Sequence, residues 1–87
     1  MKQRNEMDNE KNSISLLNLR DGQTGTITAI NGGKALAKRL ADLGMTRGSK
    51  IKVIGRTIFS GPLQIEVCGS RFVIGNGMAS KIEVELA

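Results

Sequence analysis

The chain has 87 residues, of which 39% are hydrophobic and 2% aromatic, and its net charge is +5 at pH 7. This length suits one small domain, and no apolar run approaches the ~20 residues that a membrane-spanning helix needs. With one Cys and no His, both an internal disulfide and a zinc site built from about four Cys and His ligands are excluded.

The first 13 residues predict a disordered polar tail. Residues 1–13 carry three basic and three acidic side chains, and they hold too little apolar surface to offset the entropy cost of ordering. The segment also lacks the apolar core of a secretory signal. Together with the single Cys, this favours a cytoplasmic location. Residues 14–87 then form the expected domain, which carries the whole net charge.

Alternating and β-branched runs predict about five short strands after an apolar cluster that starts at Ile14. The runs are TGTITAI (24–30), SKIKVIGRTI (49–58), LQIEV (63–67), RFVI (71–74) and KIEVEL (81–86). Glycine-rich turns separate them. Such spacing is typical of a mainly β fold, and we expect a small barrel in which closure of the sheet removes exposed edges.

One segment, KALAKRLADLG (34–44), has a good helix pattern. Leu36, Leu40 and Leu43 recur at helical spacing on one face. We expect Gly44 to end the helix in the left-handed conformation, and Met45 to fold back against Leu40 as in a Schellman motif. The helix should cover one open end of the barrel.

No group of residues predicts catalysis. Without His there is no Ser-His-Asp set, and Cys68 has no His partner. Glu83 and Glu85 share the outer face of a strand, where carboxylates are usually solvated. The glycine-rich stretches match neither a phosphate-binding nor a dinucleotide-binding loop. We therefore expect a protein that is not an enzyme, with no cofactor, no catalytic residue and no strong metal site.

Basic residues concentrate in the helix, turn and strand between residues 34 and 56. This stretch holds seven basic residues and one acid, a net charge of +6. It can be a solvated surface or a positive surface that meets an acidic partner. The basic residues are Lys34, Lys38, Arg39, Arg47, Lys50, Lys52 and Arg56.

Four motifs follow one another along the domain. They are G-x-x-G-x-I (22–27), RLADLGMTRGSKIKV (39–53), SGPLQIEVCGSRFVIG (60–75) and ASKIEV (79–84). Together they resemble the FeoA family of small bacterial ferrous-iron transport proteins, from about Leu16 to Leu86. The resemblance implies an SH3-like barrel with one inserted α-helix. It also implies a non-enzymatic role in Fe(II) uptake, as a cytoplasmic accessory of FeoB, a membrane transporter with a GTPase domain.

The resemblance and the charge pattern lead to one main hypothesis, that the chain binds the cytoplasmic region of FeoB. Four basic residues would steer the partner, and two apolar residues would contact it. These candidates are Lys38, Arg39, Arg47 and Lys52 for steering, and Met45 and Phe59 for contact.

Two alternatives remain open at this stage. The first is a nucleic-acid-binding barrel, which the basic stretch favours and the scarcity of aromatic residues disfavours. The second is a metal-sensing regulatory domain, because a related SH3-like domain occurs in iron-dependent repressors of the diphtheria-toxin type. The sequence does not fix the oligomeric state, and we expect a monomer.

Overall fold

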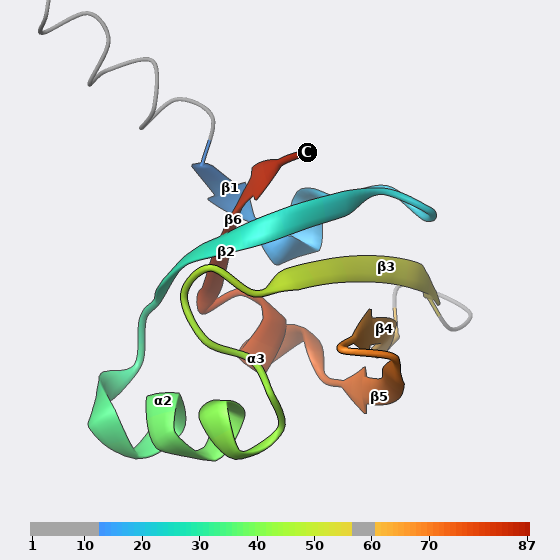
Figure 1. Ribbon diagram of the computed structural model, residues 1–87. Helices are drawn as coiled ribbons and strands as arrows, with labels where there is room; N and C mark the ends of the chain where they lie inside the picture. The colour runs from blue at the N-terminus through green and yellow to red at the C-terminus, as the bar shows by residue number, and fades with distance from the viewer. Residues whose placement is uncertain (1–12, 57–60) are drawn as a thin grey trace, which may run out of the picture.

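The computed structural model describes residues 13–56 and 61–87, and it is mainly β (Figure 1). A 3-10 helix, η1 (Leu16–Asn18), follows the first strand, helix α2 (Gly33–Asp42) joins the second strand to the third, and the short helix α3 (Asn76–Ala79) precedes the last. The strands are β1 (Ser13–Ser15), β2 (Thr24–Ile30), β3 (Lys50–Arg56), β4 (Leu63–Val67), β5 (Ser70–Ile74) and β6 (Ile82–Leu86).

The strands form one antiparallel sheet in the order β1-β6-β2-β3-β4-β5. The last strand of the chain therefore lies between β1 and β2, where Val84 is opposite Ile14 on one side and Ile27 on the other. Within the described residues β1 and β5 are not paired with each other. The curved sheet is therefore a partial barrel that stays open between these two strands.

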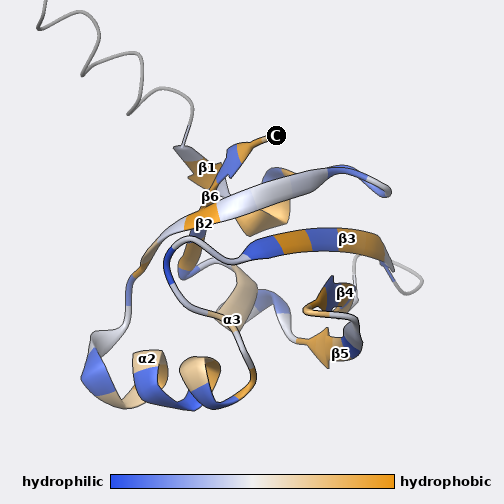
Figure 2. Ribbon diagram, viewed as in Figure 1, coloured by the Kyte–Doolittle hydropathy of each residue, from blue (hydrophilic) through white to orange (hydrophobic). Residues whose placement is uncertain are grey.

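Alternation along the strands positions the core. In β3, Ile51 and Val53 are fully buried while Lys50 and Lys52 are exposed, and Figure 2 shows the alternation as bands of colour along the strand. Strands β4 and β6 repeat the pattern, because successive side chains of a strand point to opposite faces. Helices and loops contribute the rest of the core, including Leu40 of α2 and Met45 after it.

The five predicted strands and the inserted helix are confirmed, but the sheet has one strand more. Strand β1 is missing from the sequence prediction because three residues give no alternation to recognise. It includes Ser13, which the sequence places in the tail, while residues 1–12 lie outside the described part. The prediction that closure removes the sheet edges is wrong, because β1 and β5 are both edge strands.

Helix α2 lies at one end of the sheet, beyond the ends of β2 and β3 (Figure 1). Of its residues, Leu40 is fully buried and Leu36 packs partly against the core. Leu43, predicted on the same face, is instead 42% exposed, because the chain turns at Gly44 and sends Met45 into the core in its place. No helix in residues 13–56 and 61–87 is long and apolar enough to cross a bilayer.

Candidate functional site

The sharp end of α2 sets the geometry of the candidate site. Gly44 has φ +90°, a left-handed conformation that glycine adopts without steric cost. Its amide donates to the Ala41 carbonyl (2.9 Å), and the Met45 amide donates to the Leu40 carbonyl (2.8 Å). These two bonds define a Schellman motif, so the predicted helix end is confirmed. The chain therefore reverses within two residues of the helix.

The loop that follows is held by its own hydroxyl groups and by β2. The Ser49 hydroxyl accepts from the Thr46 amide (3.2 Å) and donates to the Gly44 carbonyl (3.0 Å). The Gly48 amide then donates to the Ile27 carbonyl (2.8 Å), and the Ile27 amide donates to the Ser49 carbonyl (2.8 Å). The backbone on both sides of Arg47 is thereby fixed, while the Arg47 side chain is exposed.

A pocket of about 370 Å³ lies between α2, this loop and the end of β2. Its wall combines small and apolar side chains with two cations. The lining residues are Ile30, Ala37, Lys38, Ala41, Met45, Thr46 and Arg47. A concave apolar surface with a few polar groups at its margin is the usual form of a binding site.

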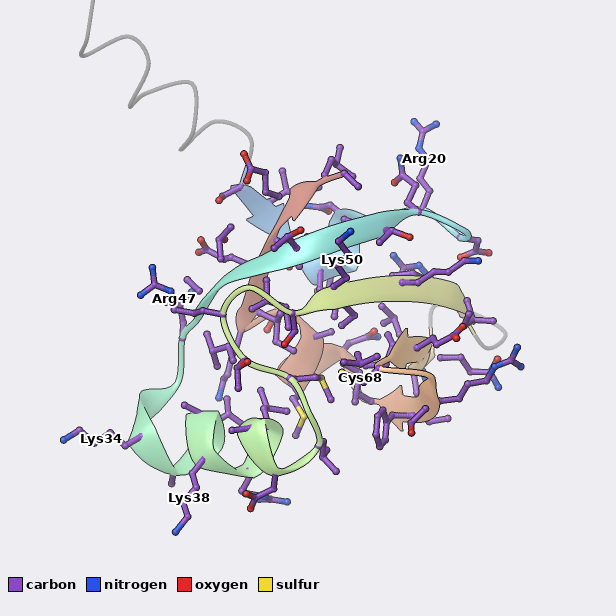
Figure 3. The ribbon with its side chains drawn as sticks, viewed as in Figure 1. Arg20, Lys34, Lys38, Arg47, Lys50 and Cys68 are labelled. Carbon is purple, nitrogen blue, oxygen red and sulfur yellow. The ribbon has the colours of Figure 1, made fainter. Side chains whose placement is uncertain are left out.

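Both charged residues in the pocket lining are basic. Lys38 and Arg47 are exposed, and Figure 3 shows both side chains projecting outward from the α2 end of the molecule, together with Lys34. Among the described residues, no acidic side chain lines the pocket. Within the described part of the chain, no ion pair engages Lys38 or Arg47. The site can therefore receive an apolar group and offer two free cations to a carboxylate or another anion beside it.

The structure brings together three of the six predicted residues, namely Lys38, Met45 and Arg47. Arg39 is exposed on α2 but does not line the pocket, and Lys52 is exposed on β3, opposite Glu66 of β4. The predicted contact through Phe59 lies outside the described residues.

The expectation that Met45 offers apolar surface to a partner is wrong for this conformation. Its side chain is 0% exposed and belongs to the buried core. The Schellman turn is the reason, because it folds the residue after Gly44 back under the helix. Met45 therefore supports the pocket from beneath and contributes little accessible surface of its own.

The basic stretch of residues 34–56 is not one continuous surface either. The Arg56 guanidinium turns inward and donates to the carbonyls of Leu17 and Leu19 (2.9 Å to Leu19). Lys50 and Lys52 line a separate pocket of about 250 Å³ beside Cys68. The predicted positive surface thus reduces to the residues of α2 and its loop, plus a pair of lysines on the sheet.

Sequence reasoning did not single out four of the lining residues, Ile30, Ala37, Ala41 and Thr46, as site residues. A signal was present on the helix, because Ala37 and Ala41 are four residues apart and leave the face beside Lys38 open. No such signal exists in the sequence for Ile30 and Thr46, because their closeness to the pocket depends on how β2 and the loop pack.

Metal ligands do not gather in the described part of the chain. No cluster of three or more His, Cys, Asp or Glu side chains that could hold an ion is found there. Cys68 is an exposed free thiol in the turn between β4 and β5.

Comparison with known proteins identifies the family. The model of the FeoA domain matches residues 14–86. The chain belongs to the FeoA family. A curated FeoA relative from Methanocaldococcus jannaschii, provisionally named Fe(2+) transport protein A, is 38% identical over 66 residues, which cover 76% of this chain and 78% of the relative. FeoA proteins are small accessory proteins of ferrous-iron transport and are not known as enzymes.

Solved FeoA structures share the fold. The crystal structure of the iron uptake regulatory protein FeoA has a TM-score of 0.78 and 32% identity, covering 86% of this chain and 97% of its own. FeoA of Stenotrophomonas maltophilia, solved with zinc and described as a prokaryotic SH3 domain protein, has a TM-score of 0.71 and 21% identity, covering 83% of this chain and 89% of its own. At that identity the likeness shows the SH3-like fold alone.

Proposed function

We propose that the chain acts in ferrous-iron uptake by binding the cytoplasmic region of a FeoB-type transporter at the pocket beside α2. The observation that carries this proposal is an apolar pocket with two cations at its margin, Lys38 and Arg47, neither of which is paired with another described residue. The partner segment inserts an apolar side chain and places a carboxylate against these cations. Burial of one Leu-sized side chain contributes about 1.5–3 kcal/mol.

The charges affect the rate of association with the partner more than the final affinity. Lys38 and Arg47 contact the partner, while Arg39 and Lys52 act at longer range and raise the association rate. Such steering weakens as salt shortens the Debye length from about 30 Å at 10 mM to about 8 Å at 150 mM. The chain alters transport by binding one conformation of the transporter more tightly than another, because an effector without that difference shifts no equilibrium. This proposal places the protein in the cytoplasm.

The test is a titration of the protein against the cytoplasmic region of the FeoB transporter from the same genome, at low and at moderate salt. We expect binding that weakens with salt and that falls at least ~tenfold in the double variant Lys38→Glu, Arg47→Glu. Arg20→Glu is the matched control for the single variant Arg47→Glu, because both replace one exposed arginine by a glutamate and Figure 3 shows Arg20 at the opposite end of the molecule. Equal loss in Arg47→Glu and in the control would remove the pocket from the proposal.

Two further titrations of the same protein test the alternative functions. Binding of a DNA or RNA duplex with a steep salt slope, together with no binding of the transporter region, would favour a nucleic-acid-binding barrel. Heat released on titration with Fe(II) or Mn(II) would favour a metal-sensing domain instead.

A further inference from the structure

Strand β5 forms an open edge of the sheet. It pairs with β4 on one side, with Val67 opposite Ser70 next to the turn and Ile65 opposite Phe72. No strand pairs with its other side within the described residues. Open strand edges present unpaired N–H and C=O groups, which act as a template for another strand.

The turn between β4 and β5 determines which residues carry those unpaired groups. Cys68 and Gly69 have φ +52° and +79°, and two successive positive values define a type I′ hairpin turn. In such a turn the flanking pair, Val67 and Ser70, is hydrogen-bonded, and bonded pairs then alternate along the ladder. The N–H and C=O groups of Arg71 and Val73 therefore point to the open edge. No backbone partner for either residue is present in the described part of the chain.

The side chains at this edge are also uncovered. Val73 is 62% exposed, the largest value among the exposed large apolar residues in the described part. Arg71 is exposed as well, and Phe72 on the other face is only half-buried against the core. Exposed apolar surface and unpaired main-chain groups thus coincide on one short strand.

We propose that β5 pairs with β5 of a second copy of this chain, in antiparallel register about Phe72. In that register Arg71 lies opposite Val73 of the second copy, and Val73 opposite its Arg71, so that each pair exchanges both N–H···O bonds. The pairing satisfies every outward-facing main-chain group of these two residues on both copies. The interface is isologous, as in most homodimers.

Side chains disfavour one of the neighbouring registers. A shift that places Arg71 opposite Arg71 of the second copy brings like charges together, which is unfavourable across a sheet. In the register about Phe72, the aliphatic part of each Arg71 covers the exposed Val73 of the other copy. The two Phe72 rings become cross-strand neighbours, an arrangement that favours pairing.

The net charge of +5 per chain opposes this association at low ionic strength and is screened as salt rises. Dimerisation therefore strengthens with salt, opposite to the binding of an acidic partner at the α2 pocket. The interface is also small, so the dimer is weak and forms towards millimolar concentration.

The test is sedimentation of the whole chain from micromolar to millimolar concentration, at about 50 mM and about 500 mM salt, with a reductant because Cys68 is an exposed thiol. We expect a shift from monomer to dimer that is larger at high salt. Val73→Lys faces Arg71 of the second copy and should raise the dissociation constant about tenfold or more. Val73→Glu faces the same arginine and should lower it about two- to tenfold at low salt.

Matched controls carry the same charges elsewhere. Leu86 is 46% exposed on β6, and Leu86→Lys and Leu86→Glu change the net charge by the same amounts without touching β5. Val73 is exposed, so its variants should fold.

A chain that stays monomeric at millimolar concentration and high salt would overturn the proposal, as would equal effects at positions 73 and 86. Weaker dimerisation of Val73→Glu than of the unmodified chain would overturn the register. The double variant Lys38→Glu, Arg47→Glu lowers the net charge and should strengthen dimerisation at low salt while it loses transporter binding, which separates this proposal from the proposed function.

Discussion

The amide of Met45 donates a 2.8 Å hydrogen bond to the carbonyl of Leu40, across the end of helix α2. This bond makes the helix end a structural part of the pocket. It buries Met45 under the helix and begins the loop that presents Arg47. The same local turn therefore serves the core and the candidate binding surface, and the first prediction concerns the glycine that permits it.

Gly44→Ala should destabilise the fold by about 1–2 kcal/mol, because an L-residue in the left-handed conformation clashes with its own carbonyl. The surroundings would not add to this cost, since a Cβ at Gly44 would lie 3.5 Å from the Cys68 sulfur, an ordinary contact. Urea unfolding measures the loss. Gly77→Ala is the control, because Gly77 is not among the glycines with positive φ and a Cβ added there would have no neighbour within 4 Å; an equal loss there would contradict the explanation.

Ala41→Glu should abolish binding of the transporter region while changing stability by less than ~0.5 kcal/mol. Ala41 is exposed and lines the pocket, so the new carboxylate would occupy the place of the partner's acid beside Lys38 and Arg47. Calorimetric titration and thermal unfolding measure the two quantities. Ala35→Glu puts the same charge on an exposed position of α2 that does not line the pocket, and it should bind as the unmodified chain does.

Ser49→Ala should weaken binding more than it weakens the fold. The hydroxyl joins the Thr46 amide to the Gly44 carbonyl, and its loss should cost about 1 kcal/mol of stability while freeing the loop that positions Arg47. Comparison of the dissociation constant with the free energy of unfolding tests this. Ser80→Ala also removes a hydroxyl that donates to a carbonyl three residues earlier, that of Gly77 (2.7 Å), and should leave binding unchanged because it lies away from the pocket.

Arg56→Met should destabilise the domain by about 1–3 kcal/mol, because the guanidinium donates to two carbonyls of the η1 segment and bonds from charged donors are the stronger ones. Methionine keeps the apolar stem and removes the donors. Arg47→Met, at an exposed position that makes no such bond to another described residue, should stay within ~0.5 kcal/mol. Equal unfolding midpoints for the two variants would show that Arg56 is not structural.

Cys68→Asn should raise stability by about 0.5–1 kcal/mol. Cys68 has φ +52° in the type I′ turn, a position where Asn followed by Gly is preferred. Cys68→Val should lower stability instead, because a β-branched residue is a conformational outlier at positive φ. Chemical denaturation in the presence of reductant measures the free energy of unfolding of the unmodified chain and of both variants. A Cys68→Val variant more stable than the unmodified chain would contradict the assignment of the turn.

Local patterns in the sequence were sufficient for most of the fold. Alternation located β3 through Ile51 and Val53, and the sequence LGM after the helix was enough to predict the Schellman turn. Both depend on interactions within a few residues. Strand β1 could not be predicted in this way, because it is defined by pairing with Glu83 and Glu85 near the other end of the chain.

The candidate site was only partly predictable for the same reason. Charge counting singled out Lys38 and Arg47, which do line the pocket. It could not separate them from Arg56, whose carbonyl acceptors lie 37 and 39 residues earlier in the chain. Nor could it show that Ile30 completes the pocket wall. These facts depend on tertiary packing, which residue type and spacing do not encode locally.

The position of β6 between β1 and β2 has a consequence for biosynthesis. Both neighbours leave the ribosome many residues before β6, yet neither can acquire this pairing until residues 82–86 have emerged. Bringing such distant segments together costs loop-closure entropy before any contact repays it. Stable folding is therefore expected to be completed late, after most of the domain has been synthesised, and β2 lacks the strand that pairs with it on one side until then.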